Sequence, residues 1–188
     1  MSTTLEVMYM NLPNKITLVR VFLIPAFLFF FLIEPLSETL NMWAVLVVFV
    51  TAAVTDAIDG YLARKLKLVT NFGKLMDPLA DKLLVCSALI AFSAVGVLSV
   101  WITIALIARE FYVSGIRQLA LEKGLVLEAI VSAKLKTITQ IVLIIYIILP
   151  PPLNILVFEA GILILAAVTL LISVYSAVEY TTKSRAIW

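Results

Sequence analysis

Long apolar runs dominate the pattern of this chain of 188 residues. A helix needs about 20 mostly apolar residues to cross a bilayer, and no segment alternates between apolar and polar positions as a membrane strand does. The pattern therefore predicts an all-α integral membrane protein. Its six predicted transmembrane helices cover residues 16–33, 42–60, 73–95, 97–120, 132–149 and 153–180.

Two kinds of connection separate these helices. Residues 34–38, Gly96 and residues 150–152 are turn-forming and carry no cation, whereas the connections around 61–72 and 121–131 are basic or polar. With the N-terminus inside, all 14 Lys and Arg fall on one side. The positive-inside rule then predicts that both termini face the cytosol.

The first 14 residues are too polar to span a membrane. Leu5, Met8, Tyr9 and Leu12 recur at helical spacing, which is typical of a short interfacial helix. The first apolar run lacks an A-x-A-like cleavage site and is followed by further spans, so we expect an uncleaved helix. We find no repeat and expect a single membrane domain over residues 1–188.

Composition narrows the class of protein further. The chain is 63% hydrophobic and 14% charged, against about 45–50% and 25% in soluble domains. This apolar composition excludes a soluble or disordered protein. A net charge of +2 is too small to indicate a nucleic-acid-binding domain. The absence of histidine excludes Ser-His-Asp and Cys-His nucleophile systems.

Charged residues gather in the predicted cytosolic halves of the second to fifth helices. Ionised groups at membrane depth are costly, so they should face one another or water. Lys and Arg can reach lipid phosphates from such positions, but anionic headgroups repel carboxylates. The pattern therefore predicts a polar, water-accessible cavity that opens to the cytosol.

The only four aspartates of the chain lie within 26 residues, at positions 56, 59, 77 and 81. Asp56 and Asp59 share a helix face, as do Asp77 and Asp81, because residues three or four apart are neighbours on a helix. A short connection makes the two helices antiparallel neighbours, so the four carboxylates should meet. Divalent cations would relieve their repulsion, and oxygen ligands favour Mg²⁺, Mn²⁺ or Ca²⁺.

A purely structural interpretation is weaker for the aspartates than for their small neighbours. Arg64 and Lys74 are too few to neutralise four buried acids. Gly60, Ala63 and Gly73 could equally serve close helix packing or leave room for a ligand.

The stretch reads D-x2-D-G-x2-A-R-x8-G-x3-D-x3-D, with eight fixed positions. It resembles the signature of the CDP-alcohol phosphatidyltransferases, a family of six-helix membrane enzymes. Residues 14–20, 108–117 and 133–137 resemble the phosphatidylglycerophosphate synthase branch of that family. The resemblance implies a homodimer in the bacterial cytoplasmic membrane, with its active site facing the cytosol.

The resemblance also implies the reaction. A phosphatidyl group would pass from CDP-diacylglycerol to sn-glycerol 3-phosphate, giving phosphatidylglycerophosphate and CMP. Two divalent cations, Mg²⁺ or Mn²⁺, would be bridged by Asp56 and Asp77, with Asp59 completing one site and Asp81 the other. Asp81 would also be the catalytic base. The CDP-lipid would be held by Asn14, Thr17, Arg20, Gly60, Ala63, Arg64 and Gly73.

An acceptor that carries a phosphate needs further cations. Arg109 and Arg117 are eight residues apart and can line one wall of a pocket. Lys134 and Lys136 lie about 200° apart around a helix, so both cannot face inward. We expect Lys134 to face the pocket and Lys136 to face lipid phosphates.

Two alternatives remain. Inositol phosphate, serine or a second phospholipid could replace glycerol 3-phosphate in the same chemistry. A divalent-cation transporter is a rival from another class, because acids at membrane depth also mark ion pathways.

Overall fold

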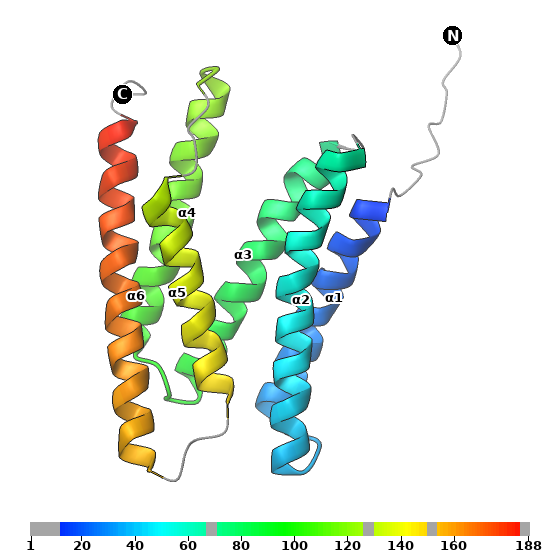
Figure 1. Cartoon of the computed structure of the whole chain (residues 1–188), viewed down its shortest axis with the longest axis vertical. Helices are drawn as coiled ribbons and strands as arrows, with labels where there is room; N and C mark the ends of the chain where they lie inside the picture. Colours follow the sequence, from blue (N-terminus) through cyan, green and yellow to red (C-terminus); the bar gives the residue numbers. More distant parts are fainter. Residues whose placement is uncertain (1–11, 67–70, 126–129, 150–153, 185–188) are drawn as a thin grey trace. The chain divides into compact units, whose positions relative to one another are not determined.

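The computed structural model describes residues 12–66, 71–125, 130–149 and 154–184, without the side chains of residues 12–18, 56–66, 71–78 and 81. Over these residues the chain forms α-helices and no strand, which confirms the predicted all-α class (Figure 1). The helices are α1 (Leu12–Ile33), α2 (Glu38–Leu66), α3 (Asn71–Ala94), α4 (Val100–Glu122), α5 (Val131–Ile148) and α6 (Ile155–Lys183).

The helix ends follow the predicted breaks to within a few residues, and the longest extensions are at the start of α1 and at both ends of α2. α1 begins at Leu12, before the apolar run, because Pro13 is tolerated in a first helical turn. α2 continues through the polar residues up to Leu66. The predicted interfacial helix falls mostly on residues 1–11, which lie outside the described residues, and its last three residues are continuous with α1.

The chain divides into two compact units, Met1–Ser87 and Ala88–Trp188, with the boundary inside α3. In the first unit α1 packs against α2. The rings of Phe27 and Phe49 lie 5.9 Å apart between these helices, and both side chains are buried. Asn41 Nδ2 donates to the Phe30 carbonyl oxygen at 2.7 Å, so the start of α2 is tied to the end of α1.

In the second unit α4 and α5 each pack against α6. The turn before α4 depends on Gly96, whose φ of 78° lies in the left-handed region that favours glycine. The amide of Val97 closes this turn on the Phe92 carbonyl oxygen at 3.0 Å. Asn154 caps α6, because its side chain accepts from the amide of Leu156 at 3.1 Å.

α6 has its polar face inside and its apolar face outside. Its buried residues recur every three or four positions and are Ile162, Ala166, Thr169, Ser173, Ser176 and Tyr180. Leu156 and Leu171 on the other side are 72% and 70% exposed. This distribution is the reverse of that of a helix on a water-soluble protein and is consistent with a surface that faces lipid.

Three helical segments in the described part of the chain are long and apolar enough to span a membrane: Glu38–Thr55, Val131–Ile148 and Ile155–Lys183. Val19–Ile33 and Lys82–Ala94 are shorter apolar segments. α4 is a continuous helix, but its apolar sequence is interrupted by the charged residues Arg109, Glu110 and Arg117. The structure is thus consistent with a membrane protein, while the number of spans and their orientation stay predictions.

Gly161 of α6 lies directly against the side chain of Tyr146 of α5, and replacing it should destabilise the second unit. A Cβ at this position would lie 2.8 Å from Cζ of Tyr146 and still closer to its hydroxyl. The ring of Tyr146 is stacked on Phe158 with centroids 5.0 Å apart, so it cannot move without disturbing a second contact. We expect Gly161→Ala to lower the free energy of unfolding by about 1–3 kcal/mol, as overpacking does.

The measurement is the thermal unfolding midpoint in detergent, with Gly115→Ala as the matched control. A Cβ at Gly115 on α4 meets nothing within 4 Å, so it gains helix propensity without a clash. Adding Tyr146→Phe to Gly161→Ala should recover part of the loss. Equal midpoints for the two alanine variants would contradict the packing described here.

Candidate active site

The four aspartates all lie in α-helix, whereas their predicted meeting across one helix interface stays a prediction. Asp56 and Asp59 lie in α2, and Asp77 and Asp81 lie in α3, all in continuous helix. Their side chains are outside the described part of the structure. Among the side chains that are described, no three carboxylates or thiols gather as metal ligands would, so the metal centre stays a prediction about these four residues.

The residues expected to hold the CDP-lipid also lie on helices of the first unit. Arg20 on α1 is fully buried. Asn14 and Thr17 precede it on the same helix, and the signature residues between positions 60 and 73 lie on α2 and α3, in each case without a described side chain. Their part in binding CDP stays a prediction.

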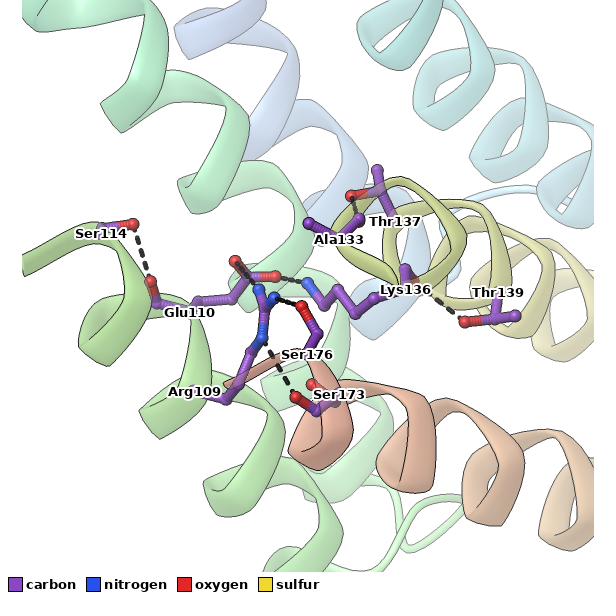
Figure 2. A network of polar contacts seen from close by, with 9 residues as sticks. All are labelled: Arg109, Glu110, Ser114, Ala133, Lys136, Thr137, Thr139, Ser173 and Ser176. Carbon is purple, nitrogen blue, oxygen red and sulfur yellow. Dashed lines mark hydrogen bonds and ion pairs between the residues drawn. The ribbon is translucent and has the colours of Figure 1, made fainter. Parts of the chain in front are cut away.

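Arg109 joins α4 to α6 in the interior of the second unit (Figure 2). Its Nη2 donates to Ser176 Oγ at 2.6 Å, and its Nε donates to the Ser173 carbonyl oxygen at 3.4 Å. Its Nη1 lies 3.6 Å from Glu110 Oε2, and the Arg109 side chain is only 9% exposed. The guanidinium is therefore fixed from two helices.

Glu110 joins α4 to α5. Its Oε1 forms an ion pair with Nζ of Lys136, while its Oε2 faces Arg109 (Figure 2). Lys136 is 2% exposed, and the Glu110 side chain is 16% exposed. One carboxylate thus bridges two cations in a shielded site, which leaves this cluster of three residues with a net positive charge.

The predicted orientation of the two lysines is wrong. Lys136 is buried against Glu110 rather than turned toward lipid phosphates, and Lys134 is exposed. The physical reason is the helix register, because Ser132, Lys136 and Gln140 are four residues apart and form one buried stripe of α5. A counter-charge is available to Lys136 on that face.

The remaining predicted cation, Arg117, is exposed and lies eight residues beyond Arg109 on α4.

A second polar cluster holds the end of α6. Glu179 accepts from Ser132 Oγ at 2.6 Å and from Lys183 Nζ at 2.8 Å. The start of α5 is thereby tied to the last turns of α6.

A cavity of about 460 Å³ in the second unit does not match the expected polar cavity. It lies at the N-terminal ends of α4 and α6, and its lining is mostly apolar, with Ser99 and Glu159 as exceptions. The cytosol-facing polar cavity therefore stays a prediction.

The sequence reasoning missed the polar partners that α6 supplies. The sequence pattern places Ser173 and Ser176 in the apolar span 153–180, but in the structure both contact Arg109. A signal was present, because Thr169, Ser173, Ser176 and Tyr180 recur at three- and four-residue spacing in an otherwise apolar helix. Such a stripe predicts a polar interior face.

The described chain is all-helical, with a buried cluster of charged residues between α4, α5 and α6 and an aspartate signature on α2 and α3. Comparison with known proteins assigns its class. The CDP-alcohol phosphatidyltransferase family matches residues 10–175. The chain belongs to this family, which confirms the resemblance seen in its motifs.

Three relatives specify the branch that the chain resembles. It is 45% identical over 141 residues to the CDP-diacylglycerol–glycerol-3-phosphate 3-phosphatidyltransferase of Bacillus subtilis, covering 70% of this chain and 73% of the relative. It is 38% identical over 184 residues to the Escherichia coli K12 protein of the same name, covering 95% and 97%. It is 36% identical over 179 residues to a probable phosphatidylglycerophosphate synthase of Mycobacterium tuberculosis H37Rv, covering 93% and 81%.

Proposed function

We propose that this chain transfers the phosphatidyl group of CDP-diacylglycerol to sn-glycerol 3-phosphate, giving phosphatidylglycerophosphate and CMP. The observation that carries the proposal is the near full-length similarity to a relative named for that reaction, at 38% identity over 95% of this chain. The complete aspartate signature on α2 and α3 supports the same chemistry independently of the name.

In this proposal residues 1–188 form one membrane domain with six spans and both termini in the cytosol. The exposed apolar face of α6 supports insertion in lipid. The bacterial relatives support a place in the cytoplasmic membrane, with the active site on the cytosolic side. Family resemblance supports a homodimer.

The four aspartates suit a pair of divalent cations. Their carboxylates are hard oxygen donors, and the helical backbone gives each pair the three- or four-residue spacing that puts two donors on one face. Asp56 and Asp77 would bridge the two ions, with Asp59 and Asp81 each completing one site. When bound, Mg²⁺ or Mn²⁺ would polarise the pyrophosphate and stabilise the charge of the leaving CMP.

The protein's own residues would position the reactants and move one proton. Asp81 would accept the proton of the glycerol 3-phosphate hydroxyl. The hydroxyl oxygen would attack the phosphorus that carries diacylglycerol. The bond from that phosphorus to the oxygen of CMP breaks, and CMP leaves with the electron pair. Arg64 and Arg20 would hold the CDP portion, together with Asn14, Thr17, Gly60, Ala63 and Gly73.

The phosphate of the acceptor needs cations of its own. Arg109 and Lys136 are the best candidates, because one carboxylate faces both and leaves the cluster cationic. Arginine and lysine with spare N–H donors bind phosphate through charge-assisted hydrogen bonds. Arg117 and Lys134, which are exposed, would attract the acceptor from the cytosol.

The acceptor is tested by measuring CMP release from CDP-diacylglycerol by the purified protein with each alcohol in turn. We expect turnover with glycerol 3-phosphate and little with serine, because serine brings no phosphate for the cationic cluster. Turnover with inositol phosphate but none with glycerol 3-phosphate would refute the proposed acceptor. Metal flux in proteoliposomes without lipid nucleotide would instead favour a transporter.

A further inference from the structure

A buried lysine needs a counter-charge, and among the described side chains the carboxylate of Glu110 lies against Lys136. Lys136 is 2% exposed, and its ammonium forms an ion pair with Glu110. An unpaired charge in such a place would be strongly unfavourable. The partner comes from another helix, so Glu110 fixes where the end of a long, flexible side chain of α5 lies relative to α4 (Figure 2).

The same carboxylate also faces the neighbouring cation. Glu110 Oε2 lies 3.6 Å from Arg109 Nη1, while the guanidinium is held from its other side by Ser176 Oγ at 2.6 Å. The hydrogen bonds to Ser176 and to the Ser173 carbonyl oxygen use one N–H of Nη2 and the N–H of Nε, while Glu110 is an ion-pair partner of Nη1. Since arginine has five N–H donors, donors remain beyond these contacts for an anion.

We propose that Glu110 is a positioning residue for the acceptor: it holds Lys136 and Arg109 in the arrangement that binds the acceptor phosphate. The inference rests on the proposed function and adds a carboxylate that touches no substrate itself. Neutralising Glu110 leaves both cations in the chain, but removes the group that orients them. The cluster then gains net positive charge and loses the ion pair with Lys136, while Arg109 keeps its hydrogen bonds to α6.

The test is Glu110→Gln, with separate titrations of glycerol 3-phosphate and CDP-diacylglycerol in the CMP-release assay. We expect the KM for glycerol 3-phosphate to rise about tenfold or more, the loss typical of a misplaced charge-assisted hydrogen bond. The KM for CDP-diacylglycerol should stay within twofold. The matched control is Glu122→Gln, the same substitution at an exposed position of α4, which should leave both constants unchanged.

A second comparison tests whether Glu110 acts through Lys136. If it does, adding Glu110→Gln to Lys136→Met should raise the KM for glycerol 3-phosphate by less than threefold, because the lysine it orients is gone. Full additivity of the two effects would overturn the proposal. Where Glu110→Gln fails to fold, Glu110→Asp keeps the charge and withdraws the carboxylate by one methylene, and the KM for glycerol 3-phosphate should still rise severalfold.

The outcomes separate this inference from the function on which it rests. An unaltered KM for glycerol 3-phosphate in both Glu110 variants, or a lower one, overturns the positioning role while the activity stands. Equal rises in both KM values together with a lower unfolding midpoint would assign Glu110 a structural role only. Absence of turnover with glycerol 3-phosphate in the unaltered protein would instead refute the proposed function.

Discussion

Asp81→Asn is expected to reduce turnover by about 10²–10⁴-fold, the range that a general base contributes. Asparagine has nearly the same shape but cannot accept the hydroxyl proton. Since the chain has no histidine, no side chain of that type can replace the carboxylate. CDP-lipid binding and much of the divalent-metal binding should survive, because the other three aspartates remain.

The matched comparison is Asp56→Asn, which removes a carboxylate assigned to both ions. Calorimetric titration with Mn²⁺ and with CDP-diacylglycerol in detergent distinguishes the two variants. We expect Asp56→Asn to lose metal binding and turnover together, whereas Asp81→Asn loses chiefly turnover. Complete loss of metal and lipid binding in Asp81→Asn would assign Asp81 to metal ligation rather than to proton transfer.

Lys136→Met is expected to lower kcat/KM for glycerol 3-phosphate by about 10²-fold, because it removes a charge-assisted contact and leaves the carboxylate of Glu110 less well compensated. Lys134→Met should change it by less than about fivefold, since a solvent-exposed cation adds only screened attraction. The two lysines are two residues apart on α5 and differ mainly in burial.

The same assay gives the outcome that would contradict this assignment. A larger effect for Lys134→Met would mean that the exposed lysine binds the acceptor and that the buried one only joins α4 to α5. The KM for CDP-diacylglycerol serves as the internal control, because neither lysine is assigned to the nucleotide.

The helices could be predicted because membrane spans depend on long apolar runs and on residues that break them. The break at residues 34–38 and the turn at Gly96 appear where the sequence places them. The start of α1 could not be predicted from apolar residues alone, since a helix can continue beyond the hydrophobic layer. Leu12 and Pro13 extend it into polar sequence for that reason.

The predicted rotation of α5 is wrong. Lys134 and Lys136 carry the same charge, so their residue types do not show which of the two is buried. What decides between them is the partner across the interface, and neither the position of Glu110 nor that of α4 can be read from local spacing. The stripe of Ser132, Lys136 and Gln140 was nevertheless visible in the sequence. Burial follows that stripe, which shows that polar periodicity in an apolar helix carries information about its interior face.

The central claim, transfer of a phosphatidyl group to glycerol 3-phosphate, is tested most directly from the lipid product. The purified protein is supplied with CDP-diacylglycerol, Mg²⁺ and glycerol 3-phosphate labelled in its phosphate, and label is counted in the lipid extract beside CMP in the aqueous phase. We predict one labelled phosphate in lipid for each CMP released, and no label in lipid without CDP-diacylglycerol. Release of CMP with no label in the lipid would contradict the account, because it would mean hydrolysis or another acceptor.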